Sequence, residues 1–389
     1  MRQHTGGPRL GIFVVCTFLF WFTLYTYVPT MTPYLVNLGI SYSMIGFIGG
    51  AYGFSQMLLR IPLGLASDRL GKRKIFLVLG LLIGAVSSFG MFFTRNAVLI
   101  LALRLLAGVS ASAWVVFTVL FSSYFEKERL ASRMSYLLTA NNCGVLFAKL
   151  AGSALAERFG HEYSFLLGGA AGLAAALLSL SITEKMPVLS EPPSLKKLLG
   201  VVRDRNLLAM SALAVFSQMI LFATIVTFTP EAAARAGADS LQLGILGTVA
   251  TVPAIVSSLL GSRLFAKRVN VRGIVALGFA LSAFGTLIVP FAGSMAAVYV
   301  SAIAVGFGCG ICMSTLLSFC TLTVDDGRRS AAMGFYQAVY GLGMFAGPVL
   351  VGFFVDWTGL SGGFFAAAAL AMLGLALTYV LLRPSAKMQ

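Results

Sequence analysis

Charged residues are scarce in this chain of 389 residues. Asp, Glu, Lys and Arg make up 11% of it, whereas 58% is hydrophobic; soluble globular domains average about 25% charged and about 45–50% apolar residues. A soluble globule of this size could not hide so much apolar surface, and an intrinsically disordered chain would not carry it. The composition predicts a membrane protein that crosses the bilayer several times.

Histidine and cysteine are also scarce. His4 and His161 lie in the N-terminal tail and in a loop, so no Ser-His-Asp catalytic set is visible. The spacing of Cys309 and Cys312 is that of a redox or zinc motif, but no second pair accompanies them. An odd number of cysteines, all in apolar stretches, argues against a disulfide framework; they are Cys16, Cys143, Cys309, Cys312 and Cys320. We expect no catalytic residue, no metal and no cofactor.

Apolar runs recur along the whole chain. A helix needs about 20 apolar residues to cross the hydrocarbon core of a bilayer. Polar breaks separate twelve such runs, at 10–30, 42–63, 75–94, 97–123, 133–156, 163–183, 207–230, 241–262, 272–292, 295–322, 331–354 and 361–382. The first run resembles a signal peptide, but it is long enough to span and lacks a convincing cleavage site. The sequence therefore predicts an all-α membrane protein with twelve transmembrane helices.

Basic residues follow the same pattern. With the N-terminus placed inside, 23 of the 28 Lys and Arg residues fall in inner tails and loops, among them Arg60 at the inner end of the second run. The outer loops hold only Arg95, Arg158 and Arg235. Cytoplasmic loops typically carry such an excess, which also explains the net charge of +15 without nucleic-acid binding. We predict a multi-pass protein of the cell (inner or plasma) membrane with both termini cytoplasmic.

The chain repeats itself at an offset of 197 to 199 residues. Three regions match, namely Thr32-Pro33 with Thr229-Pro230, Gly64 with Gly261, and Gly144, Ala148, Ser153, Glu157 and Gly160 with Gly343, Gly347, Gly352, Asp356 and Gly359. The polar stretch 184–205 separates the two halves. We predict an N-terminal six-helix bundle at 1–183, a cytoplasmic linker at 184–205 and a C-terminal six-helix bundle at 206–389. This is the parallel repeat of transporters whose site lies between two bundles.

The loop after the second run carries a recognisable motif. Residues 64–74 read Gly-Leu-Ala-Ser-Asp-Arg-Leu-Gly-Lys-Arg-Lys, which resembles the signature loop of the major facilitator superfamily: a glycine, an Asp-Arg pair, then a glycine and two basic residues. We expect Gly64 to permit close helix approach and Asp68 to accept from a neighbouring helix N-terminus. The resemblance implies that the loop gates the inward-closed state through Gly64, Asp68, Arg69, Gly71, Lys72 and Arg73.

Two further stretches support this resemblance. Residues 104–108, Arg-Leu-Leu-Ala-Gly, are similar to a motif of many proton-coupled members of the family. Residues 343–348, Gly-Met-Phe-Ala-Gly-Pro, resemble an element that antiporters usually carry in their fifth span, whereas the fifth span here reads differently at 144–149. The resemblance implies two pseudo-symmetric bundles of the major facilitator fold, transport by alternating access, and a role for Arg104 in substrate binding or proton coupling.

Two cations lie inside predicted spans. A charge near the bilayer centre costs at least ~2.5–3.5 kcal/mol. Arg104 is nine residues from Arg95, about 13 Å along a helix, which is too deep for its side chain to reach the interface. Lys149 is eight residues before Glu157, so it either faces a cavity or snorkels outward; a buried lysine loses its proton readily, which would suit a coupling group. All thirteen Asp and Glu lie at span ends or in loops, and Glu231 comes nearest to the cavity.

Mid-helix polar side chains complete the predicted path. Asn142 shares a helix face with Lys149. Interhelical hydrogen bonding is an equally good explanation for each of these residues, which are Asn142, Gln218, Tyr336, Gln337, Tyr340, Tyr52, Gln56 and Trp114. The pairs Gly46/Gly50 and Gly49/Gly53 fit close helix contacts and are assigned to packing.

Fixed cations without counter-acids predict a positively charged cavity, which favours an anionic or zwitterionic solute. We therefore predict a proton-coupled secondary transporter of a small organic solute that works by alternating access. Its partners would be the lipid bilayer, the solute and protons, with no nucleic acid, and it would be a monomer. Two alternatives stay open: a proton-coupled multidrug or metabolite efflux antiporter, which the family resemblance favours, and a non-transporting membrane sensor of the same fold.

Overall fold

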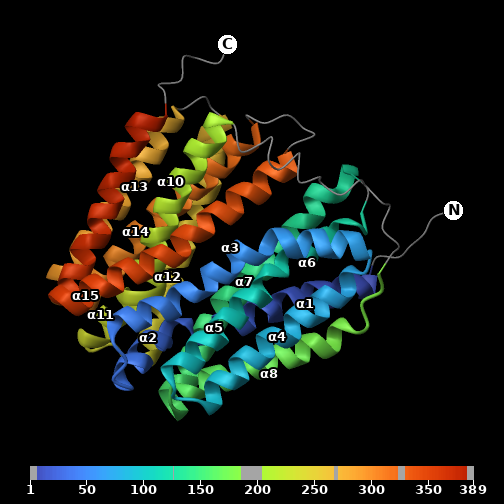
Figure 1. Cartoon of the computed structure of the whole chain (residues 1–389), viewed down its shortest axis with the longest axis horizontal. Coiled ribbons are helices and arrows are strands. Elements are labelled where there is room, and N and C mark those ends of the chain that lie inside the picture. Colours follow the sequence, from blue (N-terminus) through green and yellow to red (C-terminus); the bar gives the residue numbers. More distant parts are fainter. Residues whose placement is uncertain (1–6, 126, 185–203, 267–269, 323–328, 383–389) are drawn as a thin grey trace.

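A computed structural model describes residues 7–125, 127–184, 204–266, 270–322 and 329–382, and all regular elements in these ranges are helices (Figure 1). The first half contains α1 (Gly7–Tyr25), α2 (Val28–Asn37), α3 (Tyr42–Leu70), α4 (Arg73–Phe93), α5 (Ala97–Ser112), α6 (Trp114–Ser122), α7 (Lys127–Phe159) and α8 (Glu162–Ser179). The second contains α10 (Arg205–Leu221), the π-helix η1 (Phe222–Phe228), α11 (Thr229–Arg235), α12 (Ser240–Ala266), α13 (Val271–Ile288), η2 (Val289–Phe291), α14 (Met295–Leu322) and α15 (Arg329–Leu381).

Within these ranges, nine helical segments are long and apolar enough to cross a membrane. One of them, Ala332–Leu381, has 50 residues, about 75 Å of helix, and Gly359 interrupts it with φ 78°. It therefore corresponds to two spans. α3 and α7 have 29 and 33 residues and are long enough to cross, although they are not among the nine. Together these segments account for the twelve predicted spans.

The helices form two groups. α1 and α3 to α8 pack on one another, and so do α10 and α12 to α15. Between the groups, α3 packs along the first half of α15, and α7 packs along α12. The predicted linker at 184–205 lies almost entirely outside the described residues, so the domain boundaries stay a prediction.

Backbone conformations repeat along with the sequence. Gly39 and Gly237 have φ of 75° and 90°, and Gly160 and Gly359 have φ of 112° and 78°. Glycine adopts this left-handed region without the steric penalty of other residues. Each pair is separated by the offset of the sequence repeat and ends equivalent helices, so the two halves share one chain path.

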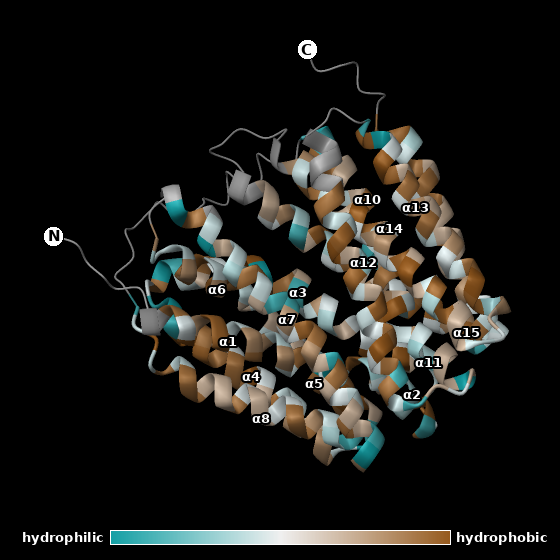
Figure 2. Cartoon of the chain, turned by 180° about the vertical axis from the view of Figure 1, so that it is seen from behind, coloured by the Kyte–Doolittle hydropathy of each residue, from teal (hydrophilic) through white to brown (hydrophobic). Residues whose placement is uncertain are grey.

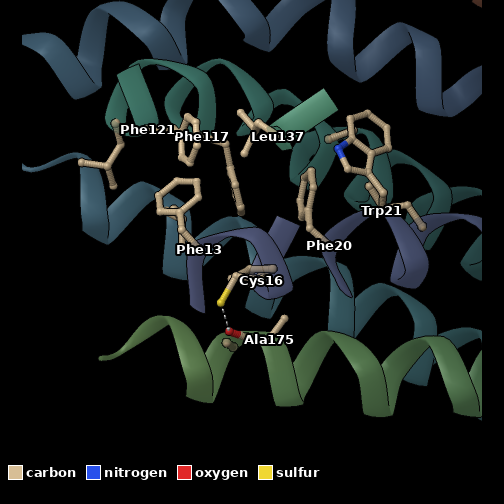
Figure 3. Packing of buried hydrophobic residues seen from close by; sticks show 14 of the residues in the cluster. Phe13, Cys16, Phe20, Trp21, Phe117, Phe121, Leu137 and Ala175 are labelled. Atoms are coloured by element: carbon tan, nitrogen blue, oxygen red, sulfur yellow. Dashed lines mark hydrogen bonds between the residues drawn. The ribbon is translucent and has the colours of Figure 1, made fainter. Parts of the chain in front are cut away.

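Aromatic side chains fill the core of the first group (Figure 3). The rings of Phe20 and Phe117 stack with centroids 4.7 Å apart, and Phe13 lies 5.2 Å from Phe121. Cys16 donates a weak hydrogen bond to the carbonyl of Ala175, with 3.7 Å between sulfur and oxygen. These contacts hold α1 between α6 and α8.

The molecule has two polar ends (Figure 2). We call the end with the α3–α4 turn and the last residues of α15 the termini end, and the end with the α2–α3 turn and Gly359 the far end. At the far end α2 contacts α11 and α12, so the two groups converge there, and they diverge toward the termini end (Figure 1).

Candidate functional site

Three cations lie inside the helical assembly. Arg104, Lys149 and Arg60 are 2%, 7% and 6% exposed. Among the described residues, none of the three has a carboxylate within 4.0 Å. Within the described ranges their partners are polar but neutral groups and aromatic rings.

Arg104 is held by tyrosines. Its Nη1 donates to the hydroxyl of Tyr27 at 3.1 Å, and its guanidinium carbon lies 5.5 Å and 5.1 Å from the ring centroids of Tyr27 and Tyr52. The Arg104 Nε is buried without a hydrogen-bond partner in the described part of the chain. A guanidinium has five N–H donors, so Arg104 retains unused capacity for an anion.

Two helix interruptions surround this arginine. The chain turns at Thr26 and Tyr27 between α1 and α2, and η1 winds as a π-helix at the equivalent place in the second half. The turn sets Tyr27 against Arg104, and Phe222 of η1 lies parallel to Tyr52 with centroids 6.4 Å apart. π-Helical turns are frequent at functional sites, and discontinuous spans line transporter sites.

Lys149 crosses from one group of helices to the other. Its Nζ donates to the carbonyl of Gly247 at 2.9 Å and to the hydroxyl of Thr251 at 2.6 Å, both on α12. The ring centroid of Tyr25 lies 5.9 Å from the same nitrogen. Lys149 is buried, so it does not snorkel outward; it tethers α7 to α12.

Arg60 is the site residue that the sequence pattern missed. The assignment of Arg60 to the inner basic loop is wrong, because its side chain is buried between the groups. Nη2 donates to Oε1 of Gln56 at 2.8 Å, and Nη1 donates to the hydroxyl of Tyr340 on α15 at 3.0 Å. The spacing of Tyr52, Gln56 and Arg60 puts all three on one helix face, and this i, i+4, i+8 pattern is the sequence signal that points Arg60 inward.

Other predicted residues join this cluster. Tyr336 is buried, with its ring 5.6 Å from that of Tyr340 and its hydroxyl 3.8 Å from the sulfur of Met313. Gln218 is 8% exposed, and its Oε1 has no partner among the residues described. Gln218 is thus a second buried polar side chain with an unpartnered atom in the described part of the chain.

Three further predicted residues are exposed or only half-buried. Asn142 is exposed although it is two turns from Lys149. Gln337 is half-buried. Trp114 is half-buried and packs its ring 5.3 Å from that of Trp21. The structure does not bring Asn142 to the buried cations.

The signature loop makes different contacts from those expected. A Cβ built on Gly64 would meet only Val115, at 3.5 Å, so the expected close approach at Gly64 is wrong. Asp68 pairs with Arg73 at 2.8 Å, and Glu184 accepts from the backbone N–H of Arg73 and Lys74. Among the described residues Asp68 therefore pairs with a side chain while Glu184 caps α4, and the contact of Asp68 with a neighbouring helix N-terminus stays a prediction.

The remaining loop residues shape the turn. Gly71 ends α3 with φ 62°, in the left-handed region that glycine tolerates. Arg69 and Lys72 are exposed. In this conformation the loop bonds within its own half of the molecule.

Carboxylates of one group cap helices of the other at the far end. Asp356 accepts from the backbone N–H of Tyr42 at 2.9 Å and of Ser43 at 2.8 Å, where α3 begins. Glu157 accepts from the backbone N–H of Ser240 at 2.7 Å, where α12 begins. Helix N-termini offer unpaired N–H groups and partial positive charge. Glu157 and Asp356 match in the repeat, so the two caps are equivalent.

Glu231 also takes part in the contacts between the two groups at the far end. It is 4% exposed and accepts from the hydroxyl of Tyr42 at 3.2 Å and from Nε of Arg235 at 2.9 Å. Arg235 also donates to Tyr42. Within the described residues, hydrogen bonds link the two groups at several depths. The first is that of Asp356 at the far end, and the last is the Arg60–Tyr340 bond.

A separate apolar groove of about 750 Å³ lies between the two halves of α15. Its lining includes Leu350, Phe354, Phe365 and Leu373, all more than 40% exposed. These side chains face outward and suit contact with lipid, so the groove is not part of the polar cluster.

Known proteins resemble most of this chain. A family model described as Major Facilitator Superfamily matches residues 13–234 and 211–389. An uncharacterised MFS-type transporter of Methanocaldococcus jannaschii is 24% identical over 359 residues, which cover 88% of this chain and 92% of the relative. The quinolone resistance protein NorA of Staphylococcus aureus is 27% identical over 164 residues, 42% of each protein.

Solved structures share the fold at low identity. A bacterial homologue of the human lysosomal transporter Spinster, captured inward-facing and unoccupied, aligns with a TM-score of 0.83 at 13% identity over 97% of each chain. A mutant of the nucleoside transporter NupG aligns with a TM-score of 0.81 at 14% identity, over 96% of this chain and 99% of that chain.

Proposed function

Because the chain belongs to the major facilitator superfamily of membrane transporters, we propose that it carries a small organic anion or zwitterion across the membrane, coupled to protons. Members of this family are transporters and not enzymes. The solute and the coupling ion are our proposals, and each is supported by a different feature of the chain.

Unpaired interior cations support an anionic solute. Arg104, Lys149 and Arg60 are buried without a carboxylate within 4.0 Å in the described residues. A bound acidic group would supply the missing counter-charge, and Coulomb attraction is strong where water is excluded. This absence of counter-acids is the observation that carries the proposal.

The proposed path uses alternating access. The excess of Lys and Arg in the predicted inner tails and loops supports placing the termini end in the cytoplasm. Without Arg60, which is buried, 22 cations remain in the inner tails and loops against three in the outer loops. In that orientation the far end is outward and closed by Asp356, Glu157 and Glu231. The shared fold with an inward-facing transporter agrees with this state. Opening would separate α3 from α15 and α7 from α12.

Lys149 supports proton coupling. Arginine stays protonated in proteins, whereas lysine can release its proton when water is excluded. Lys149 is also bonded to α12 across the interface, so a change in its charge would alter a contact that opening must break. Protonation and conformation would thus be linked at one side chain.

A second candidate is drug efflux. NorA, named for quinolone resistance, matches 42% of this chain, and the Gly-Pro element at 343–348 resembles that of antiporters. An exporter of lipophilic cations would require an interior carboxylate, and among the described residues Glu231 is the buried one, already bonded to Arg235.

Flux in proteoliposomes tests these proposals. With a pH gradient imposed, we expect uptake of some members of an organic anion panel. This uptake should be abolished by Arg104→Gln, reduced by Lys149→Gln and unchanged by Arg95→Gln, which alters an exposed arginine. Transport of lipophilic cations alone would overturn the anion proposal in favour of efflux. Binding without flux of any solute would indicate a sensor.

A further inference from the structure

Arg60 lies further along α3, toward the termini end, than the contacts of Arg104 with Tyr27 and Tyr52. Tyr52 and Arg60 are eight residues apart on α3, about 12 Å along the axis, and side chains on a helix lean toward its N-terminus. Arg104 contacts the ring of Tyr52, and Arg60 bonds Gln56. The two guanidinium groups are therefore separated by on the order of 10 Å.

Both guanidinium groups are under-bonded. Arg60 uses one donor on Gln56 and one on Tyr340, and its Nε is buried without a partner in the described ranges. The Nε of Arg104 is likewise unpartnered there. Tyr340 and Gln56 are neutral, so neither compensates a charge that is costly to bury. Lys149 differs, since a carbonyl and a hydroxyl satisfy it.

We propose that Arg60 and Arg104 bind opposite ends of one solute, and that the solute is an elongated organic dianion with two acidic groups. This inference rests on the proposed anion transport and deepens it. Two fixed positive charges are neutralised by two negative ones, whereas a monoanion would leave one guanidinium uncompensated. The apolar body of such a solute would lie along Tyr52 and Phe222, whose rings occupy the level of Arg104.

The proposal also gives Arg60 a part in the conformational change. Its hydrogen bond to Tyr340 joins α3 to α15 at 3.0 Å. Of the hydrogen bonds described between the two groups of helices, this one lies nearest the termini end. A carboxylate that accepts from Arg60 would compete with the Tyr340 hydroxyl, because hydrogen bonds between charged groups are stronger than those to a neutral oxygen. The dianion would thereby loosen one contact between the groups.

Dissociation constants of linear dicarboxylates and chain-matched monocarboxylates test the proposal. They are measured on the purified full-length protein by tryptophan fluorescence, since Trp21 and Trp114 adjoin the cluster. In the wild type we expect dicarboxylates to bind at least about tenfold more tightly than monocarboxylates, with an optimum at an intermediate chain length. Arg60→Gln should abolish this preference, because the second carboxylate then has no cation to pair with.

Controls separate the possible failures. Arg69→Gln alters an exposed cation on the same helix and should preserve the preference. Monocarboxylate binding with no dicarboxylate preference, no optimum in chain length, or a preference that survives Arg60→Gln would overturn the dianion proposal and leave the anion carrier standing. If no organic anion binds or is transported, the proposed function itself fails. The series of dicarboxylates of different carbon-chain lengths is measured on the wild type. It therefore tests the dianion proposal even if Arg60→Gln does not fold.

Discussion

Tyrosine hydroxyls and rings, rather than carboxylates, hold the interior arginines. Tyr27 and Tyr52 contact Arg104, and Tyr340 contacts Arg60. Neutral partners orient a guanidinium without cancelling its charge, so the attraction for an anion is retained. A carboxylate partner would orient the arginine equally well but would compete with the solute.

Loss of the Tyr27 hydroxyl should weaken solute binding without removing it. Tyr27→Phe keeps the ring contact with Arg104 at 5.5 Å and deletes the hydrogen bond at 3.1 Å. A hydrogen bond to a charged group contributes about 1.5–3 kcal/mol, so we expect Kd to rise about tenfold, against a complete loss of binding in Arg104→Gln. Equilibrium binding of the best transported anion measures both; equal losses in the two variants would contradict an orienting role for Tyr27.

Removal of the Lys149 ammonium should uncouple transport from protons. Lys149→Gln can still accept or donate a hydrogen bond at Thr251 but cannot change charge, so we expect concentrative uptake under a pH gradient to fall at least about tenfold while solute exchange continues. Lys149→Arg, which keeps a permanent charge, should behave in the same way. Uptake that still responds to the pH gradient in either variant would show that another group carries the proton.

At the scale of helices, closure of the far end depends on paired caps. Asp356→Ala and Glu157→Ala each remove a cap that crosses between groups, and such caps contribute about 0.5–2 kcal/mol. We expect each variant to raise the labelling rate of a cysteine at the buried Thr227 several-fold, and the double variant to raise it further. Glu162→Ala is the control, since Glu162 pairs with Arg95 within one group; an equal increase there would rule out a role specific to the caps.

Glycines mark where helices touch within a group and between groups. A Cβ on Gly46 would lie 2.3 Å from the carbonyl oxygen of Pro348 in the other group, whereas a Cβ on Gly144 would lie 2.5 Å from that of Phe18 in its own group. Overpacking of this kind costs about 1–3 kcal/mol. Gly46→Ala should therefore favour opening of the far end, while Gly144→Ala should lower the melting temperature.

Two measurements separate these glycine effects. The labelling rate of a Thr227→Cys reporter should increase in Gly46→Ala and stay near wild type in Gly144→Ala. Thermal unfolding should show the reverse order. A lower melting temperature without faster labelling in Gly46→Ala would mean that the interface at Gly46 stays packed throughout transport.

Hydropathy and repeats predicted the spans because both depend on local composition. The break at Thr26–Tyr27, the π-helix at 222–228 and the burial of Arg60 were not predictable in the same way. Each depends on which helix face meets the other group, and a hydropathy border cannot tell an arginine beside the lipid headgroups from one turned inward. The contacts of Asp68 depend on conformation, which a sequence does not specify.

At the scale of the whole molecule, orientation in the membrane decides how every contact is interpreted. The far end is outward only if the termini are cytoplasmic, and this assignment rests on charge asymmetry. Exposed positions exist at both ends, including Asn96 and Ala236 at the far end and Arg69 at the termini end. Four native cysteines are buried and Cys143 is half-buried, so a Cys143→Ser background leaves little reactive thiol.

Single cysteines at these positions should report the orientation directly. In intact cells we expect a membrane-impermeant maleimide to label Asn96→Cys and Ala236→Cys but not Arg69→Cys, which should react only after the membrane is permeabilised. Both far-end sites lie outside the hydrophobic spans, so their labelling does not depend on conformational exchange. The opposite pattern would place the closed end in the cytoplasm, and Asp356 and Glu157 would then close the inner side of the transporter instead of the outer one.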